Sequence, residues 1–345
     1  MNQPIVECVP NFSEGKDERV IDAIAEAIRQ ERGTVLLNVD SNRDADRTVM
    51  TFAGKPESVL RSAYAAIKTA AEKIDLRHKK GKHPRMGATD VCPLIPLRNM
   101  KMEDAIVLAE RLAEKVGDEL NIPVYLYEYA AKSDSRRSLP QIRKGEFEKL
   151  HSKISDPEWK PDHGPEKVHT TAGASVIGAR NFLIAYNINL KTKDAAIAHK
   201  IAQSVRESGK KVIQNGEKVH IPGKLKALRA IGWYLEDFDC AQVSLNLLNF
   251  WQTNMAEAYE TVKETARELG TDVNGSELVG MIPVDAVAES VSYYDSANKN
   301  LSEEKMVKLL NEKLQLDAVK PFAPQEKIIE WKLSTLAPEV FGSNE

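Results

Sequence analysis

The sequence predicts an α+β protein built from two tandem ferredoxin-like sandwiches, each with the element order βαββαβ. Two observations lead to this prediction. The chain has 345 residues, which is about two domains at roughly 150 residues each. Strand and helix patterns follow the order βαββαβ once before and once after a polar stretch at 131–171. The two halves share little sequence identity, so the predicted repeat is one of architecture.

The first half alternates β-branched runs with apolar residues at helical spacing. Residues 4–12 are apolar and β-branched, as in a strand, and residues 20–28 have the apolar spacing of a helix. Gly33 ends this helix, and Pro56 stands where the next one begins. The expected strands are 4–12, 34–40, 47–53, 91–97 and 123–129, and the expected helices are 20–33, 56–74 and 103–120.

The second half repeats this order after the stretch at 131–171. That stretch is rich in Ser, Asp, Pro and charge, carries one short helical pattern at 141–154, and is interpreted as a connector. The expected strands are 182–190, 228–236, 241–250 and 277–283, and the expected helices are 194–207 and 255–269. The predicted domains are an N-terminal subdomain at 1–180, a C-terminal subdomain at 181–335 and a tail at 336–345.

The composition argues against several classes of protein. The chain has 48 Lys and Arg against 51 Asp and Glu, a net charge of −3, whereas a surface that wraps nucleic acid needs an excess of cations. Its three cysteines are an odd number and lie far apart, which favours a reducing compartment over a disulfide framework. The sequence shows no signal-peptide pattern and no apolar run of about 18 residues. We therefore expect a cytoplasmic protein that binds neither nucleic acid nor a membrane.

Polar side chains alternate with apolar ones along several predicted strands. Successive side chains of a strand point to opposite faces of the sheet, so residues of one parity share a face. The polar sets of shared parity are Asn187 and Asn189; Gln242, Ser244 and Asn246; Glu7 and Asn11; Asn38 and Asp40; and Tyr125, Tyr127 and Tyr129. Two interpretations stay open: a solvated surface, or a groove between two open sheet faces that holds a polar ligand.

One loop carries a candidate for proton transfer. Residues 78–87 read HKKGKHPRMG, and the cations around His83 are Lys79, Lys80, Lys82 and Arg85. Nearby cations lower the pKa of an imidazole, and a neutral imidazole accepts a proton as a general base. The alternative is an exposed basic loop with an incidental histidine. The sequence has no HExxH motif, paired CxxC motif or dense Cys/His cluster, so we predict no metal site.

Several long segments resemble the formiminotransferase family, in collinear order over nearly the whole chain. They read VECVPNFSEG (6–15), RTVMTFAG (47–54), HPRMGATDVCPLIP (83–96), PVYLYEYAA (123–131), DSRRSLPQIRKGEFE (134–148), FLIAYNINL (182–190), IGWYLEDFDCAQVSLNLLNF (231–250) and PFAPQEKIIEW (321–331). The resemblance implies transfer of a formimidoyl group between tetrahydrofolate, as co-substrate, and L-glutamate in histidine degradation. It also implies two α/β subdomains with a ligand tunnel between them, in a homodimer.

The same resemblance implies which residues act. The catalytic histidine of the family's HPRMG motif matches His83, and an acidic residue on the second strand matches Asp40, whose carboxylate would hold a positive amidinium. The family's folate-contacting segment follows a D-x-G-P sequence. It matches Gly164, Pro165, Glu166, Lys167, Val168, His169, Thr170, Thr171, Ala172 and Gly173.

Two alternatives to formimidoyl transfer stay open. One is formyl transfer from 5-formyltetrahydrofolate, because the two groups are nearly isosteric. The other is a folate-binding protein without catalysis, against which the intact HPRMG motif counts. Some family members continue into a helical cyclodeaminase domain. Because this chain ends at Glu345, we expect it to perform the transfer alone.

Overall fold

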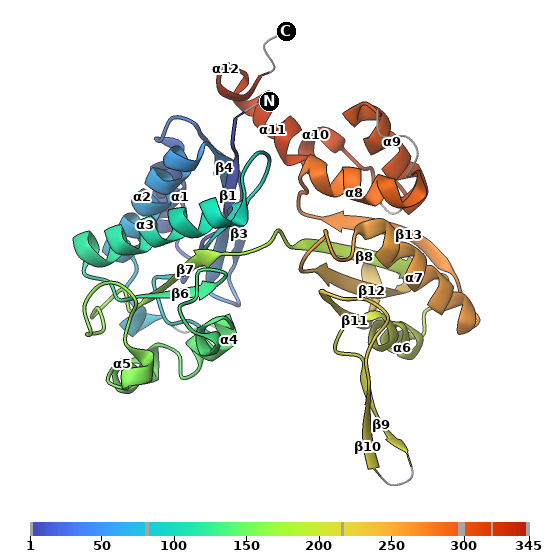
Figure 1. The fold of residues 1–345 in the computed structure, drawn as a ribbon, viewed down its shortest axis with the longest axis horizontal. Helices are drawn as coiled ribbons and strands as arrows, with labels where there is room; N and C mark the ends of the chain where they lie inside the picture. The colour runs from blue at the N-terminus through green and yellow to red at the C-terminus, as the bar shows by residue number, and fades with distance from the viewer. Residues whose placement is uncertain (1–2, 80–82, 215–216, 296–300, 319, 343–345) are drawn as a thin grey trace. The chain divides into compact units, whose positions relative to one another are not determined.

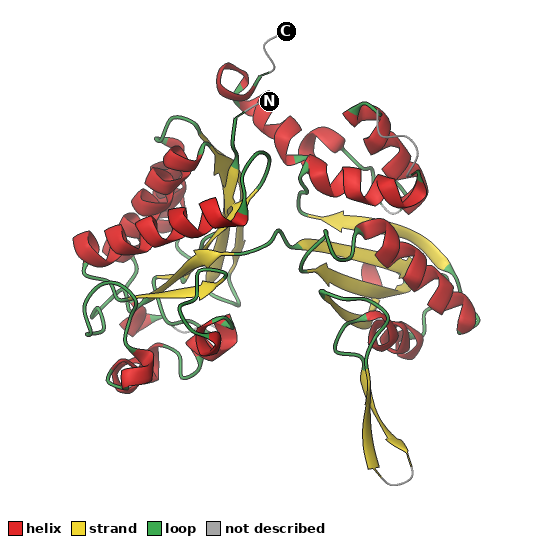
Figure 2. Ribbon diagram, viewed as in Figure 1, coloured by secondary structure: helices red, strands yellow, loops and turns green. Residues whose placement is uncertain are grey.

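The computed structural model describes residues 3–79, 83–214, 217–295, 301–318 and 320–342. The chain divides into two compact units, Met1–Asn181 with Leu336–Glu345, and Phe182–Thr335 (Figures 1 and 2). Each unit has its own sheet with helices packed on it, so each is described by itself. No helix in the described ranges has both the length and the apolar character that a membrane span needs.

The first unit contains a seven-stranded sheet. Its strands are β1 (Val6–Cys8), β2 (Asn11–Phe12), β3 (Thr34–Asn42), β4 (Arg47–Gly54), β5 (Thr89–Pro96), β6 (Val124–Glu128) and β7 (Ser175–Ala179). Both β1 and β2 lie between β4 and β5, so they act as one strand that is interrupted at Val9 and Pro10. The spatial order is β3, β4, β1 with β2, β5, β7 and β6.

The strands from β3 to β5 reproduce the ferredoxin-like order, which confirms the predicted fold of the first half. Helix α1 (Glu18–Arg29) precedes β3, and α2 (Pro56–Lys73) leads from β4 to β5. The side chain of Asp17 caps α1, and Pro56 opens α2. Helix α3 (Met102–Leu120) then leads to β6. The sequence did not predict β7, a short apolar run that pairs in parallel with both β5 and β6.

The two faces of this sheet are covered differently. One face packs on α1, α2 and α3 through an apolar cluster that includes Phe52 and Leu94. On the other face, α4 (Leu139–Arg143) and α5 (Leu150–Ile154) pack over β5, β6 and β7 and bury Tyr125 and Tyr127. Both interpretations, a solvated surface and a ligand groove, are therefore wrong for Tyr125 and Tyr127, because residues predicted as a connector fold over them. Asp40 on β3 remains exposed on this second face.

The second unit repeats the architecture. Its strands are β8 (Ile184–Leu190), β9 (Lys210–Gln214), β10 (Glu217–Ile221), β11 (Leu228–Leu235), β12 (Cys240–Leu247) and β13 (Val273–Val279). Four of them form an antiparallel sheet in the order β11, β12, β8, β13, which is again ferredoxin-like and confirms the prediction. The crossover helices are α6 (Ala195–Val205) and α7 (Met255–Glu268).

The remaining elements follow these two sheets. The other helices are α8 (Val284–Tyr294), α9 (Glu303–Leu314), α10 (Pro324–Lys327), α11 (Ile329–Leu336) and α12 (Pro338–Phe341). Short 3₁₀ turns lie at Leu76–His78, Asp134–Arg136, Phe147–Lys149, Pro157–Trp159 and Glu236–Phe238. Gln3 Nε2 donates to the Val340 carbonyl at 2.6 Å, within the first unit.

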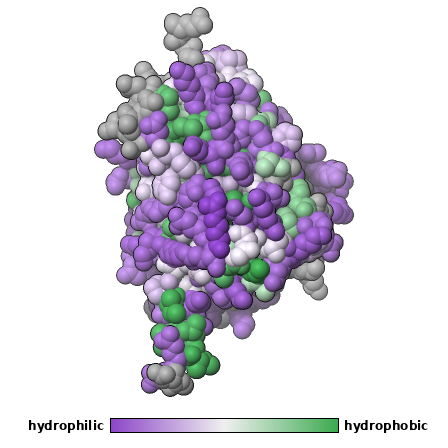
Figure 3. All heavy atoms as spheres, turned by 90° about the vertical axis from the view of Figure 1, so that its right-hand side faces the viewer, coloured by the Kyte–Doolittle hydropathy of each residue, from purple (hydrophilic) through white to green (hydrophobic). Residues whose placement is uncertain are grey.

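The β9–β10 hairpin was not predicted. An Asn-Gly pair at 215–216 in the sequence is the signal that would have found it. The hairpin extends from the second unit and gathers hydrophobic atoms near its end (Figures 1 and 3), where Ile213 is 74% exposed.

Candidate functional site

Polar side chains share the second face of the first sheet, as the alternation predicts. Asn11 on β2 and Asp40 on β3 both lie opposite Val49, on the two sides of β4. Arg47 precedes Val49 by two residues and therefore points to the same face. This part of the sheet thus presents an amide, a carboxylate and a guanidinium on one surface.

His83 contacts this surface through Arg47. Nη1 of Arg47 lies 2.7 Å from Nδ1 and 2.9 Å from Nε2 of the imidazole. Nδ1 also lies 2.7 Å from the carbonyl oxygen of Pro84. A guanidinium can only donate and a carbonyl oxygen can only accept. We therefore assign the neutral tautomer in which Nδ1–H donates to Pro84 and Nε2 accepts from Arg47.

The surroundings of His83 lower its pKa. Burial is the largest cause, and the positive charge of Arg47 is the next. Arg143 acts in the same direction, while the Pro84 carbonyl and the carboxylate of Asp90 oppose it. A lowered pKa keeps the imidazole neutral near pH 7, which is the form that accepts a proton. The predicted direction of this shift is confirmed.

The cations responsible differ from those expected in the loop. Lys79 forms an ion pair with Glu14, and Arg85 lies 2.9 Å from a carboxylate oxygen of Glu148. Neither cation is among the groups that shift the pKa of His83, and acidic partners neutralise both, so the prediction that these two loop cations lower it is wrong. Lys80 and Lys82, the other two expected cations, lie outside the described residues.

Asp90 on β5 connects the two arginines near His83. Its Oδ2 lies 2.6 Å from Nη2 of Arg143 and 3.6 Å from Nη1 of Arg47. Its Oδ1 accepts a hydrogen bond from the Met86 N–H at 2.9 Å. The side chain of Asp90 is 2% exposed, and those of Arg47 and Arg143 are 17% and 12% exposed. The structure therefore gathers a half-buried imidazole, two guanidiniums and one buried carboxylate.

The C-terminal end of the predicted folate segment packs against the His83 loop. Gly173 forms a β-bridge with Gly87, and the Ala88 N–H donates to the Ala172 carbonyl at 2.9 Å. A Cβ on Gly87 would lie 2.0 Å from the carbonyl oxygen of Ala174, so only glycine permits this approach. The structure thus places the loop that carries His83 next to the C-terminal end of residues 164–173.

The rest of the segment combines buried and exposed residues. Val168 and Ala172 are buried, and Glu166, Lys167 and Thr170 are exposed. Gly164 packs closely on Gly117 of α3. Nδ1 of His169 accepts from the Ala172 N–H at 3.0 Å, and burial lowers the pKa of His169. These contacts fix the backbone of the segment, whose contact with folate stays a prediction.

Asp40 shares the face of Arg47 without touching the imidazole cluster. Its side chain is exposed on β3 and makes no hydrogen bond or ion pair with another residue that the structure describes. Within the described ranges, no group of three or more His, Cys, Asp or Glu side chains is placed to hold a metal ion.

The open face of the second sheet carries the polar row expected from β12. Gln242 Nε2 donates to Asn189 Oδ1 at 2.8 Å, and Trp233 Nε1 donates to Gln242 Oε1 at 3.0 Å. Beside this row, Arg229 and Asn246 face each other across β11 and β12. The predicted alternation is therefore confirmed for these strands.

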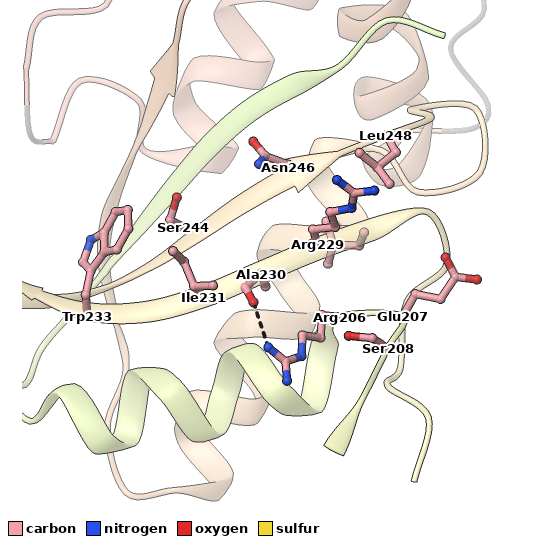
Figure 4. A pocket seen from close by; sticks show the side chains of 11 residues that line it. Arg206, Glu207, Ser208, Arg229, Ala230, Ile231, Trp233, Ser244, Asn246 and Leu248 are labelled. Carbon is pink, nitrogen blue, oxygen red and sulfur yellow. Dashed lines mark hydrogen bonds between the residues drawn. The ribbon is translucent and has the colours of Figure 1, made fainter. Parts of the chain in front are cut away.

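A pocket of about 720 Å³ opens beside this face (Figure 4). Its lining includes the guanidinium of Arg229 and the apolar side chains of Ile231 and Trp233, with Ser244 and Asn246 on the neighbouring strand. Its volume lies in the range of small-molecule sites, about 300–1,000 Å³.

Sequence reasoning missed Arg47, Asp90 and Arg143 as members of the site. Asp90 could have been suspected, because it precedes an apolar strand and a buried carboxylate needs partners. Arg143 lies in the stretch that the sequence predicts to be a connector, and no local pattern of the sequence connects it with Asp90.

Comparisons with known proteins agree with this architecture. Residues 5–180 match the family model described as the formiminotransferase domain, N-terminal subdomain, and residues 185–334 match the formiminotransferase domain. The chain is 47% identical to the formimidoyltransferase-cyclodeaminase of Rattus norvegicus, over 97% of this chain and 61% of that protein. It is 40% identical to two proteins named glutamate formimidoyltransferase. The one from Streptococcus pyogenes matches over 84% of this chain and 93% of its own length, and the one from Thermoplasma acidophilum over 89% and 99%.

Proposed function

Because this chain belongs to the formiminotransferase family, we propose that it transfers a formimidoyl group between tetrahydrofolate and L-glutamate. The chain spans 61% of the length of the rat relative, so the activity is a proposal for this chain. The observation that carries it is the imidazole of His83, held neutral beside Arg47 by burial and positive charge. Matches to two proteins named for this transfer, over 93% and 99% of their lengths, support the same reaction.

His83 acts on a proton in this proposal. The amine of glutamate is an ammonium near pH 7 and cannot attack until it loses a proton. Nε2 of His83 accepts that proton once the substrate N–H replaces Nη1 of Arg47 at this nitrogen. In the reverse direction the imidazolium returns the proton to the departing amine. General acid–base catalysis of this kind contributes about 10²–10⁴-fold to the rate.

The charges of the surface favour formimidoyl over formyl transfer. A formamidine carries a positive charge when it is protonated, whereas a formamide is neutral. The exposed carboxylate of Asp40, on the same face as Arg47, would attract the first and not the second. The positive charge of Arg47 and Arg143 would attract substrate carboxylates to this surface, and holding two substrates in register supplies further rate.

Several further properties belong to the same proposal. Residues 164–173 contact the folate co-substrate, the open face of the second sheet contributes to substrate binding, and catalysis needs no metal. The protein works as a cytoplasmic homodimer, with subdomains at 1–180 and 181–335 and a tail at 336–345.

A donor comparison tests the proposed reaction. The purified chain is incubated with tetrahydrofolate and either N-formimidoyl-L-glutamate or N-formyl-L-glutamate, and both folate products are quantified by mass spectrometry. We expect rapid formation of 5-formimidoyltetrahydrofolate and a slower formyl reaction. A faster formyl reaction would assign the enzyme to formyl transfer instead. If the chain binds folate but forms neither product, the remaining alternative is a folate-binding protein without catalysis.

A further inference from the structure

The carboxylate of Asp90 sits at an irregularity in the sheet. Opposite β2, Asn11 pairs with Val91 while Phe12 pairs with Thr89, so β5 contains one extra residue at Asp90. This is the pattern of a β-bulge, which re-aims a side chain and recurs beside active sites. Asp90 is 1% exposed despite its charge, and a buried carboxylate persists only where it is paired.

Its partners come from three separate segments. Arg47 belongs to β4, Arg143 to α4, and the Met86 N–H to the loop that carries His83 three residues earlier. One carboxylate therefore contacts a strand, a helix and the catalytic loop. Arg47 in turn reaches both ring nitrogens of His83 and donates through Nη2 to Oδ1 of Asn11.

The charges around the imidazole do not cancel. Among the residues that the structure describes, the charged groups that influence His83 are Arg47 from β4, Arg143 from α4 and Asp90 from β5, with the Pro84 carbonyl as a further polar neighbour. These two cations and one anion leave a net positive charge, which disfavours the imidazolium. Removing the anion would make the surroundings still more positive, and removing a cation would do the reverse.

We propose that Asp90 is the positioning residue of this site. Its buried carboxylate, at the bulge of β5, fixes Arg47, Arg143 and the His83 loop in one arrangement and contributes to the net charge around the imidazole. Its effect on formimidoyl transfer rests on the proposed function. Its effect on His83 itself does not, because the contacts concern the protein alone.

The competing explanation is an ordinary structural ion pair. The same unit offers a matched pair for comparison, since Oδ1 of Asp162 lies 2.8 Å from Nη1 of Arg136 and its Oδ2 accepts from the Leu126 N–H at 2.8 Å. The side chains of Asp162 and Arg136 are 8% and 10% exposed, much as in the Asp90 pair. Arg136 and Asp162 are not among the groups that shift the pKa of His83.

The test follows the titration of His83 by NMR in the full chain, with histidine labelled and the signal assigned by its loss in His83→Gln. Asp90→Asn removes the anion and is expected to lower the pKa of His83 further, while Arg143→Gln removes a cation and is expected to raise it. Both variants break the same ion pair, so a merely structural role would not shift the pKa in opposite directions. Asp162→Asn is expected to lower the thermal stability and leave the titration of His83 unchanged.

Kinetics add a second measurement. If the transfer takes place, Asp90→Asn is expected to lower kcat/KM about 10²-fold, as displacement of a catalytic group by about 1 Å does. Opposite pKa shifts in a protein that transfers no group would support the positioning role and overturn the proposed function. Equal titrations in wild type and Asp90→Asn, in a protein that is active, would overturn the positioning role and leave the function standing. Shifts of the same sign in Asp90→Asn and Arg143→Gln would also overturn the positioning role.

Discussion

Nη1 of Arg47 lies 2.9 Å from Nε2 of His83. A histidine that serves as a base is often oriented by a carboxylate, which stabilises the imidazolium. Here the neighbour is a cation, which has the opposite effect and contributes to the lowered pKa of His83. Burial lowers the pKa of Arg47 itself to about 10, so the guanidinium stays charged near pH 7. Both burial and the charge of Arg47 therefore favour the neutral imidazole near pH 7.

This relationship predicts the pH dependence of the transfer. With 5-formimidoyltetrahydrofolate and L-glutamate as substrates, His83 must be neutral to accept the proton of the attacking amine, so kcat/KM should reach its maximum above the pKa of His83 and fall as the pH drops through that pKa. Replacing Arg47 by Gln removes one cause of the lowered pKa, and the acidic limb should move to higher pH. The measurement is kcat/KM against pH. The control is Arg61→Gln, which breaks an ion pair with Glu31 and should leave the limb in place.

Gly87 tests the contact between the His83 loop and the folate segment. Gly87→Ala would place a Cβ 2.0 Å from the Ala174 carbonyl oxygen, and overpacking of this kind costs about 1–3 kcal/mol of the free energy of unfolding. We expect lower stability together with weaker folate binding. For comparison, Gly270→Ala meets no atom within 4 Å but has a φ of +79°, so it should lower stability only. If Gly87→Ala binds folate as tightly as the wild type, the contact between the His83 loop and residues 164–173 does not contribute to folate binding.

A substitution at Asp40 tests whether the site prefers a positively charged transferred group. Asp40→Asn keeps the size of the side chain and removes the charge that would hold the amidinium. A hydrogen bond to a charged group contributes about 1.5–3 kcal/mol, which corresponds to a loss of about 10- to 150-fold in kcat/KM. Steady-state kinetics should show this loss with Asp40→Asn and not with Asp22→Asn, whose exposed side chain lies on α1. Unchanged kinetics would remove Asp40 from the mechanism.

Arg229 tests whether the second sheet contacts substrate. Its guanidinium lines the pocket near Asn246, its partner on β12 (Figure 4), where it can bind a carboxylate of folate or glutamate. Arg229→Gln should raise KM about tenfold, the loss of one charged hydrogen bond, with a smaller effect on kcat. Arg267→Gln on α7, which loses an ion pair with Asp272, is the matched surface control. An unaltered KM would exclude this pocket from substrate binding.

The sequence predicted the fold well where local patterns decide it. The alternation of Gln242 and Ser244 with Val243 places the polar pair on the open face and the valine in the core. Pro56 opens a helix as expected, because its ring fixes φ and its missing N–H is not needed there. These features depend on neighbours along the chain, so a single sequence contains them.

The cluster around His83 could be predicted only in part. The imidazole and the lowered pKa were foreseen, but the cations lie 36 and 60 residues away from His83, at Arg47 and Arg143. The basic residues next to it in sequence, Lys79 and Arg85, are instead bound to acidic partners. Such pairings depend on tertiary contacts between segments, and the sequence alone does not show which charges meet.

The central claim is that neutral His83 is the general base of formimidoyl transfer. Its most direct test is turnover of His83→Ala with tetrahydrofolate and N-formimidoyl-L-glutamate, measured beside folate affinity in the same preparation. His151→Ala on α5, an exposed histidine, is the control. We predict a loss of turnover of about 10²–10⁴-fold or more, with folate affinity largely unchanged. Near-normal turnover in His83→Ala would contradict the account.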